Sequence, residues 1–251
     1  GEFVMLGAYT GFVLQEYLGF PFLLCVPCAF LVVGLIGAGI ERGLIRYLYK
    51  RPLDTLLATW GLSLVLIQGV RLIIGPEPKN IASPAFLNAS MKAWVFELSW
   101  FRVFIFVVAL AAFGITWWLM HRTRIGLMVR AVTQNKEMAA VHGIDASKVY
   151  TLTFAYGAGL AGLAGSMFGV IKNVFPDMGA GYIVEAFLVV VVGGVGSLAG
   201  SLASAAGLGE IYSVFAYFTN GTFAKFWLFL LVVIFLRFRP QGLFAEALAR
   251  R

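Results

Sequence analysis

Long apolar segments recur from one end of this 251-residue chain to the other, and they restrict its fold more than any other feature of the sequence. The runs 22–40 and 226–236 contain no charged residue. A helix crosses the hydrocarbon core of a bilayer, roughly 30 Å thick, with about 20 apolar residues. A membrane β-barrel would instead show short segments of alternating polarity. We therefore predict an all-α fold, a polytopic transmembrane helix bundle.

The composition places the chain in a bilayer and argues against a nucleic-acid partner. Apolar residues make up 61% of the sequence and charged residues 12%, whereas soluble domains are about half apolar and a quarter charged. The net charge is +7, but the Lys and Arg residues lie mostly in short loops, where positive charge sets the orientation of membrane helices. We therefore predict that the apolar surface of the chain contacts lipid.

Hydropathy divides the chain into about eight spans or re-entrant helices, which we assign to a single domain, 1–251. The expected segments are 4–17, 20–40, 53–74, 101–120, 150–172, 183–199, 203–218 and 223–238. The glycine-rich stretch 193–200 fits either a full cytoplasmic turn or part of a re-entrant pair, and both alternatives stay open. Because the chain opens in apolar sequence without a Met, we expect a truncated N-terminus.

Basic residues gather in the loop after the second span, in the loop after the fourth span and in the C-terminal tail. They are Arg42, Arg46, Lys50 and Arg51; Arg122, Arg124, Arg130, Lys136 and Lys148; and Arg237, Arg239, Arg250 and Arg251. Cytoplasmic loops of membrane proteins carry an excess of Lys and Arg. These loops and the C-terminus are therefore predicted to be cytoplasmic.

Small residues recur at helical spacing in two places. Ala158, Gly162, Gly165 and Gly169 follow one another at spacings of four, three and four, and Gly196 and Gly200 repeat the spacing of four. Such series let two helix backbones approach closely in membranes. We predict helix packing at these six positions.

The polar segment 121–149 contains enough apolar residues to fold. A helix is expected over about 128–142, ended by a left-handed Gly143, with Ile144 making the hydrophobic contact that follows such a cap. Asp145 is expected to cap the next span. Because both ends are fixed by spans, this segment suits a handle for a soluble partner. The alternative is a helix that merely lies on the membrane surface.

Motifs for catalysis, nucleotide binding and metal binding are missing from the sequence. His121 and His142 do not form an HExxH pair, and there is no GxSxG. Cys25 and Cys28 form a CxxC inside an apolar run without a second pair, which favours packing. There is no GxxxxGK[ST] phosphate loop, so any ATP must be bound by another subunit. We predict a transport subunit without enzymatic activity, cofactor or metal site of its own.

A few polar side chains lie within predicted spans. Thr55, Thr59 and Ser63 recur every four residues, and Glu210 lies well inside the seventh span. Ionisable groups inside a membrane are costly and often functional. Glu210 therefore suits either a pore-facing acceptor or proton carrier, or a contact between helices. Hydroxyls in membrane helices often bond their own backbone carbonyls, so a structural role for the three hydroxyls stays open.

Four strings together resemble a known family. They are RPLDTLLATWGLSL from Arg51, RAVTQNKEMAAVHGI from Arg130, VFPDMGAGYIVEAFLVVVVGGVGSLAG from Val174, and RPQGLF from Arg239. In this order, and across nearly the whole chain, they resemble the branched-chain amino-acid permease family of ABC importers. Within that family, the first and third strings look most like the urea transporter permease branch.

The resemblance implies a membrane permease that moves urea or a short amide across the bacterial inner membrane. It also implies four kinds of partner: a second, homologous permease, two ATP-binding cassette subunits that use the ATP, a periplasmic solute-binding protein, and the lipid bilayer. The segment 121–149 then corresponds to the cytoplasmic coupling segment. Its candidate coupling residues are Arg130, Asn135, Met138, Ala139, Gly143 and Ile144.

For a small polar solute, a pathway needs a few placed polar groups in an apolar channel. Thr55, Thr59, Ser63 and Glu210 are the candidates. Three alternative functions remain. They are import of branched-chain amino acids by the same machinery, proton-coupled secondary transport through Glu210, and passive conduction of urea.

Overall fold

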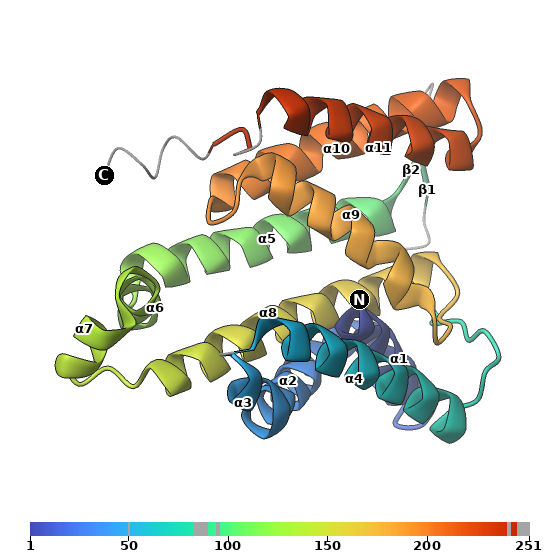
Figure 1. The fold of residues 1–251 in the computed structure, drawn as a ribbon. Helices are drawn as coiled ribbons and strands as arrows, with labels where there is room; N and C mark the ends of the chain where they lie inside the picture. Colours follow the sequence, from blue (N-terminus) through green and yellow to red (C-terminus); the bar gives the residue numbers. More distant parts are fainter. Residues whose placement is uncertain (50, 83–89, 94–95, 240–241, 245–251) are drawn as a thin grey trace. The chain divides into compact units, whose positions relative to one another are not determined.

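The computed structural model describes residues 1–49, 51–82, 90–93, 96–239 and 242–244 (Figure 1). These residues form two compact units, Gly1–Ala180 and Gly181–Arg251. The assignment of both units to a single permease domain stays a prediction. The predicted cytoplasmic residues Lys50, Arg250 and Arg251, and residues 240–241 of the RPQGLF string, lie outside the described residues.

Three helices form the core of the first unit: α1 (Glu2–Glu16), α2 (Phe22–Ile40) and α8 (Ala146–Ile171). Each packs against the other two, and the side chains of Met5, Ala29 and Val33 are fully buried between them. Lipid tails are as apolar as Leu, so burial from water does not hold such helices together. Close packing must do so.

Glycines on α8 make this close packing possible. A Cβ added at Gly162 would lie 2.6 Å from the Cβ of Val33, and one added at Gly165 would clash with the backbone carbonyl of Val4. Only residues without a side chain fit at these positions. Two further small residues of α8 are also closely packed: Ala158 lies opposite Gly37 of α2, and Gly169 lies opposite Ile81 in the loop after α4.

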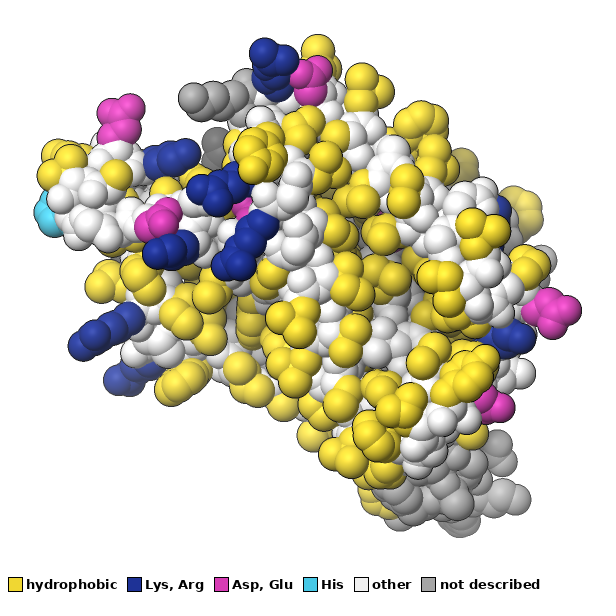
Figure 2. All heavy atoms as spheres, turned by 90° about the horizontal axis from the view of Figure 1, so that it is seen from below, with side chains coloured by type: hydrophobic (Ala, Val, Ile, Leu, Met, Phe, Trp, Pro, Cys, Tyr) yellow, Lys and Arg dark blue, Asp and Glu magenta, His cyan; other side chains and the backbone are white. Residues whose placement is uncertain are grey.

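Two further helices of the first unit, α4 (Pro52–Ile73) and α5 (Trp100–Arg122), leave most of their apolar surface uncovered. Buried residues make up 6% of the most apolar window of α4 and none of that of α5, compared with 39% for α8. Figure 2 shows apolar side chains spread over one face of the molecule, with charged side chains mainly toward the edges of the view. Surfaces of this kind are suited to lipid or to another membrane subunit.

Short elements connect these helices. After α2 the chain forms a π-helical turn, η1 (Glu41–Ile45), and the short helix α3 (Arg46–Leu48). Between α4 and α5 lies an antiparallel hairpin of β1 (Ser90–Ala93) and β2 (Phe96–Ser99), with Ser90 opposite Ser99. The sequence did not indicate this hairpin, which is too small to change the fold class.

The loop that follows α4 is joined to the loop that follows α8. Lys79 and Val174 exchange two backbone hydrogen bonds of 2.8 Å. The Arg71 guanidinium lies 2.5 Å from the Asp177 carboxylate. Two loops that the charge pattern places on the same side of the membrane therefore meet.

The second unit consists of α10 (Leu198–Phe218), α11 (Gly221–Phe238) and most of α9 (Met178–Gly193), which begins in the first unit. Its core contains Val192, Leu208, Leu228 and Val232. At the α9–α10 turn a Cβ on Gly193 would lie 2.6 Å from the carbonyl group of Gly200. Gly196 has φ +90° and belongs to the turn. Its expected place in a helix seam was therefore wrong.

The helices agree with the predicted all-α, polytopic class. Among the described residues, six helical segments are long and apolar enough to cross a membrane. The first and sixth expected spans correspond to shorter helices, α1 with 15 residues and α9 with 16. The sixth was placed too far along the chain, at 183–199, because its apolar run continues through the glycine turn.

Candidate functional site

The segment between α5 and α8 forms two helices, α6 (Arg124–Gln134) and α7 (Lys136–Val141). The expected continuous helix over 128–142 was therefore wrong. Asn135 is extended, with φ −153° and ψ 104°, and its Oδ1 accepts hydrogen bonds of 3.0 Å from the backbone N–H groups of Glu137 and Met138. Asn competes with the helix backbone for these donors and so starts a new helix.

Gly143 ends α7 in the left-handed conformation, with φ +77°. The N–H of Ile144 donates to the carbonyl of Ala139 at 3.0 Å, and the N–H of Gly143 donates to the carbonyl of Ala140 at 3.0 Å. This pair of bonds is the Schellman motif. It satisfies two carbonyls that the end of the helix would otherwise leave unpaired.

Asp145 caps α8 directly after this motif. Its Oδ1 accepts from the N–H of Ser147 at 3.0 Å and from the N–H of Lys148 at 3.4 Å. Burial raises the pKa of the Asp145 carboxyl, but these backbone donors and the Lys148 ammonium outweigh burial, so the pKa lies below its ordinary value. The cap is therefore ionised at neutral pH.

A small hydrophobic core fixes these elements against one another. Val132 of α6, Ala139 of α7, and Ala146 and Val149 of α8 are buried together, with Ile144 packed against them. The Arg130 guanidinium donates to the backbone carbonyl of Met120 at 2.7 Å, at the end of α5. The segment is therefore packed as one body between α5 and α8.

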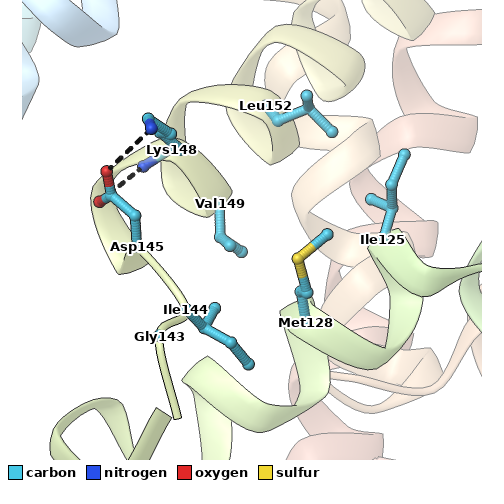
Figure 3. Close-up of a pocket in the computed structure, with 8 residues that line it drawn as sticks. All are labelled: Ile125, Met128, Gly143, Ile144, Asp145, Lys148, Val149 and Leu152. Carbon is cyan, nitrogen blue, oxygen red and sulfur yellow. Dashed lines mark hydrogen bonds and ion pairs between the residues drawn. The ribbon is translucent and has the colours of Figure 1, made fainter. Parts of the chain in front are cut away.

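A cavity of about 320 Å³ lies between α6, the Gly143 turn and the start of α8. Figure 3 shows Met128 and Ile125 facing Val149 and Leu152 across it, with Asp145 and Lys148 paired at the side. Its lining is predominantly apolar, apart from this ion pair, whose N···O distance is 3.6 Å. The cavity is suited to an apolar group.

Three apolar side chains of α6 and α7 are exposed. Leu127 is 61% exposed, Met138 59% and Val141 79%. These side chains are available for contact with another protein or with lipid. Of the predicted coupling residues, Met138 is one of these three, Ala139 is buried, and Asn135 and Gly143 shape the backbone.

The three predicted pathway hydroxyls on α4 differ in their hydrogen-bond partners. Thr59 Oγ1 bonds the carbonyl oxygens of Thr55 and Leu56 in its own helix, at 2.9 and 3.0 Å. Thr55 Oγ1 bonds backbone carbonyls as well. Ser63 Oγ donates to the Glu2 carboxylate of α1, at 2.6 Å. Sequence reasoning did not single out Glu2.

The carboxylates of the second unit differ in their surroundings. Glu210 is exposed on α10 and has no hydrogen bond or ion pair within the described part of the chain. Glu185 of α9 lies 2.7 Å from the Lys225 ammonium of α11, which ties these two helices together. No cluster of three metal-ligating side chains occurs among the described residues.

Comparison with known proteins completes this description. The sequence model of the family described as "Branched-chain amino acid transport system / permease component" matches residues 1–237. The permease protein BraD of a high-affinity branched-chain amino acid transport system, from Pseudomonas aeruginosa, is 30% identical over 97% of this chain and 83% of its own length.

Two further relatives come from other organisms. The probable branched-chain amino acid transport permease LivH of Methanocaldococcus jannaschii is 26% identical over 89% of this chain and 72% of its own length. The autoinducer 2 import system permease LsrD of Yersinia enterocolitica is 31% identical over 73% of this chain and 55% of its own length. No solved structure matches. Because the family match covers nearly the whole chain, this protein belongs to the branched-chain amino acid transport system permease family.

Proposed function

We propose that this chain is the membrane-spanning permease subunit of an ATP-driven importer for branched-chain amino acids. The match to BraD over 97% of the chain is the observation that carries this proposal. Urea or a short amide was the first expectation from the sequence. The names of two relatives that are 30% and 27% identical over 97% of this chain favour the amino-acid alternative instead.

ATP would be bound and hydrolysed by separate cassette subunits that dock on the segment from α6 to α7. The exposed side chains of Leu127, Met138 and Val141 support this assignment, because they offer an apolar contact on a packed, otherwise polar element. The Schellman turn at Gly143 then transmits displacement of α7 to α8. A second permease and a periplasmic binding protein complete the proposed assembly in the inner membrane, with the C-terminus in the cytoplasm.

The pathway for the solute is proposed along α4, and Glu210 is kept as a second candidate. Of the α4 hydroxyls, Ser63 has a side-chain partner on another helix, Glu2, which supports a polar point between α1 and α4. Thr55 and Thr59 donate their hydroxyl protons to backbone carbonyls, so both lone pairs of each hydroxyl oxygen are left to accept from a passing donor.

The test is uptake of radiolabelled leucine and, separately, urea. The assay uses vesicles that hold this permease, its partner permease, both ATPases and the binding protein. We expect leucine uptake that requires ATP and is not reduced by excess urea. ATP-dependent urea uptake that ignores leucine would restore the urea assignment. Flux without ATP, or flux abolished by a proton uncoupler at constant ATP, would reject the ATP-driven importer.

A further inference from the structure

A carboxylate that sequence reasoning missed is the most completely buried charged side chain among the described residues. Glu41 lies at the start of η1, directly after α2, and is fully buried. An isolated carboxylate in such a place costs several kcal/mol unless hydrogen bonds compensate. The chain therefore keeps this residue at a cost that its contacts must offset.

Glu41 has two hydroxyl donors from two other parts of the first unit. Thr151 Oγ1, on α8, donates to one carboxylate oxygen, and Tyr49 Oη, just after α3, donates to the other at 3.1 Å. Burial and then the charge of Glu41 raise the pKa of Tyr49 to about 12, so this hydroxyl keeps the proton that it donates. Glu41 thus joins the end of α2, the start of α8 and the approach to α4.

The same contacts continue to the segment that we propose binds the ATPases. The ring of Tyr49 lies 5.2 Å from the ring of Tyr150, centroid to centroid, and the Lys136 ammonium of α7 lies 5.5 Å above the Tyr150 ring. On the other side, Thr55 Oγ1 of α4 donates to the carbonyl of Leu48 at 2.8 Å. These contacts connect α7 and α4 to Tyr49 and its neighbour Leu48, and the Tyr49 hydroxyl donates to Glu41.

The π-helical turn gives this junction a way to yield. Its wider hydrogen-bonded turn is an irregularity of the kind that is frequent at functional sites and at helix bends. A carboxylate with two separate donors can also hold one while the other moves. Neither feature is needed merely to pack α2 against α8, since glycines already do so along their length.

We propose that Glu41 is a positioning residue for coupling, which keeps the start of α8 and the approach to α4 linked so that movement of α7 moves both. This inference rests on the proposed ATP-driven import. It predicts that, without the carboxylate, the assembled complex still hydrolyses ATP but imports less leucine for each ATP.

The experiment measures leucine imported per ATP hydrolysed, at equal amounts of assembled complex, in vesicles that hold all subunits. Glu41→Gln, Thr151→Val and Tyr49→Phe each weaken the junction. Thr153→Val is the matched control on α8, because its hydroxyl bonds only the Val149 carbonyl of its own helix. Tyr47→Phe, at an exposed position 78% accessible to solvent, is the matched control for tyrosine.

We expect the import per ATP to fall about fivefold or more in Glu41→Gln, the low end of ordinary coupling strengths. Smaller falls are expected in the two hydroxyl variants, and none in the two controls. An unchanged ratio of import to hydrolysis in Glu41→Gln would overturn the inference, and this includes the case in which both rates fall in the same proportion. So would failure of all three junction variants to assemble, which would make Glu41 a folding residue. ATP-independent import by the unmodified complex would instead refute the proposed function itself.

Discussion

Replacing Gly143 with Val tests whether the turn between α7 and α8 transmits force. Apart from its two chain neighbours, no atom of the described residues lies within 4 Å of a Cβ added at Gly143. The Cβ itself therefore introduces no clash, and the effect is expected to come chiefly from the backbone. A left-handed conformation costs a residue with a Cβ roughly 1–2 kcal/mol, and a β-branched side chain resists it further.

A cost of this size is enough to change the population of the turn. One to two kcal/mol corresponds to a factor of about 5–30 in an equilibrium. The valine variant should therefore open the two bonds from Gly143 and Ile144 to the α7 carbonyls about that much more often. Uncoupling of ATP hydrolysis from import should follow, because α7 would no longer move α8.

Two measurements check this reasoning. Hydrogen exchange at the amide of Ile144 reports opening of the turn, and leucine imported per ATP reports coupling. Gly143→Asn is the matched control, because Asn tolerates the left-handed region, and it should retain most of both. Exchange and coupling unchanged in the valine variant, or equal damage in the asparagine variant, would refute the proposed role of the turn.

Three further predictions follow from other contacts. Gly165→Leu should lower the melting temperature of the purified protein by pushing α1 off α8, at a cost of about 1–3 kcal/mol. Gly157→Ala should not, because no described atom beyond its own helical turn lies within 4 Å of the added Cβ. Thr59→Val should slow leucine uptake without loss of assembly if its hydroxyl lines the pathway; full uptake would leave it a backbone-bonded residue only. Because the folded-state pKa of Asp145 is lowered, its stabilisation of the first turn of α8 is present above the ordinary Asp pKa and lost as the pH falls through the lowered value. Hydrogen exchange in this turn should therefore increase in acid, and Asp145→Asn should remove that increase.

The lengths of the apolar runs predicted most of the architecture, because a bilayer imposes a length and a composition on each helix. The Gly143 turn and the Asp145 cap were also predictable, since both depend on neighbouring residues. The break at Asn135 was missed, although an Asn followed by Lys and Glu is a recognisable start of a helix.

The Glu41 junction lay beyond sequence reasoning for a different reason. Next to Arg42, a Glu at the end of an apolar run looks like part of a solvated loop. Its partners, Tyr49 and Thr151, lie 8 and 110 residues away. Only tertiary packing shows that the helical path continues through η1 and buries the carboxylate.

The joined loops after α4 and α8 determine where these two helices are free to move. The Lys79–Val174 backbone pair and the Arg71–Asp177 ion pair join the C-terminal ends of α4 and α8. The 22 residues of α4 make a rod of about 33 Å at 1.5 Å per residue. If that joined end is the pivot, a tilt of about 10° moves the opposite end of such a rod by about 6 Å. The helix then works as a lever that pivots at the joined loops, and its moving end is the one that contacts Leu48 through Thr55.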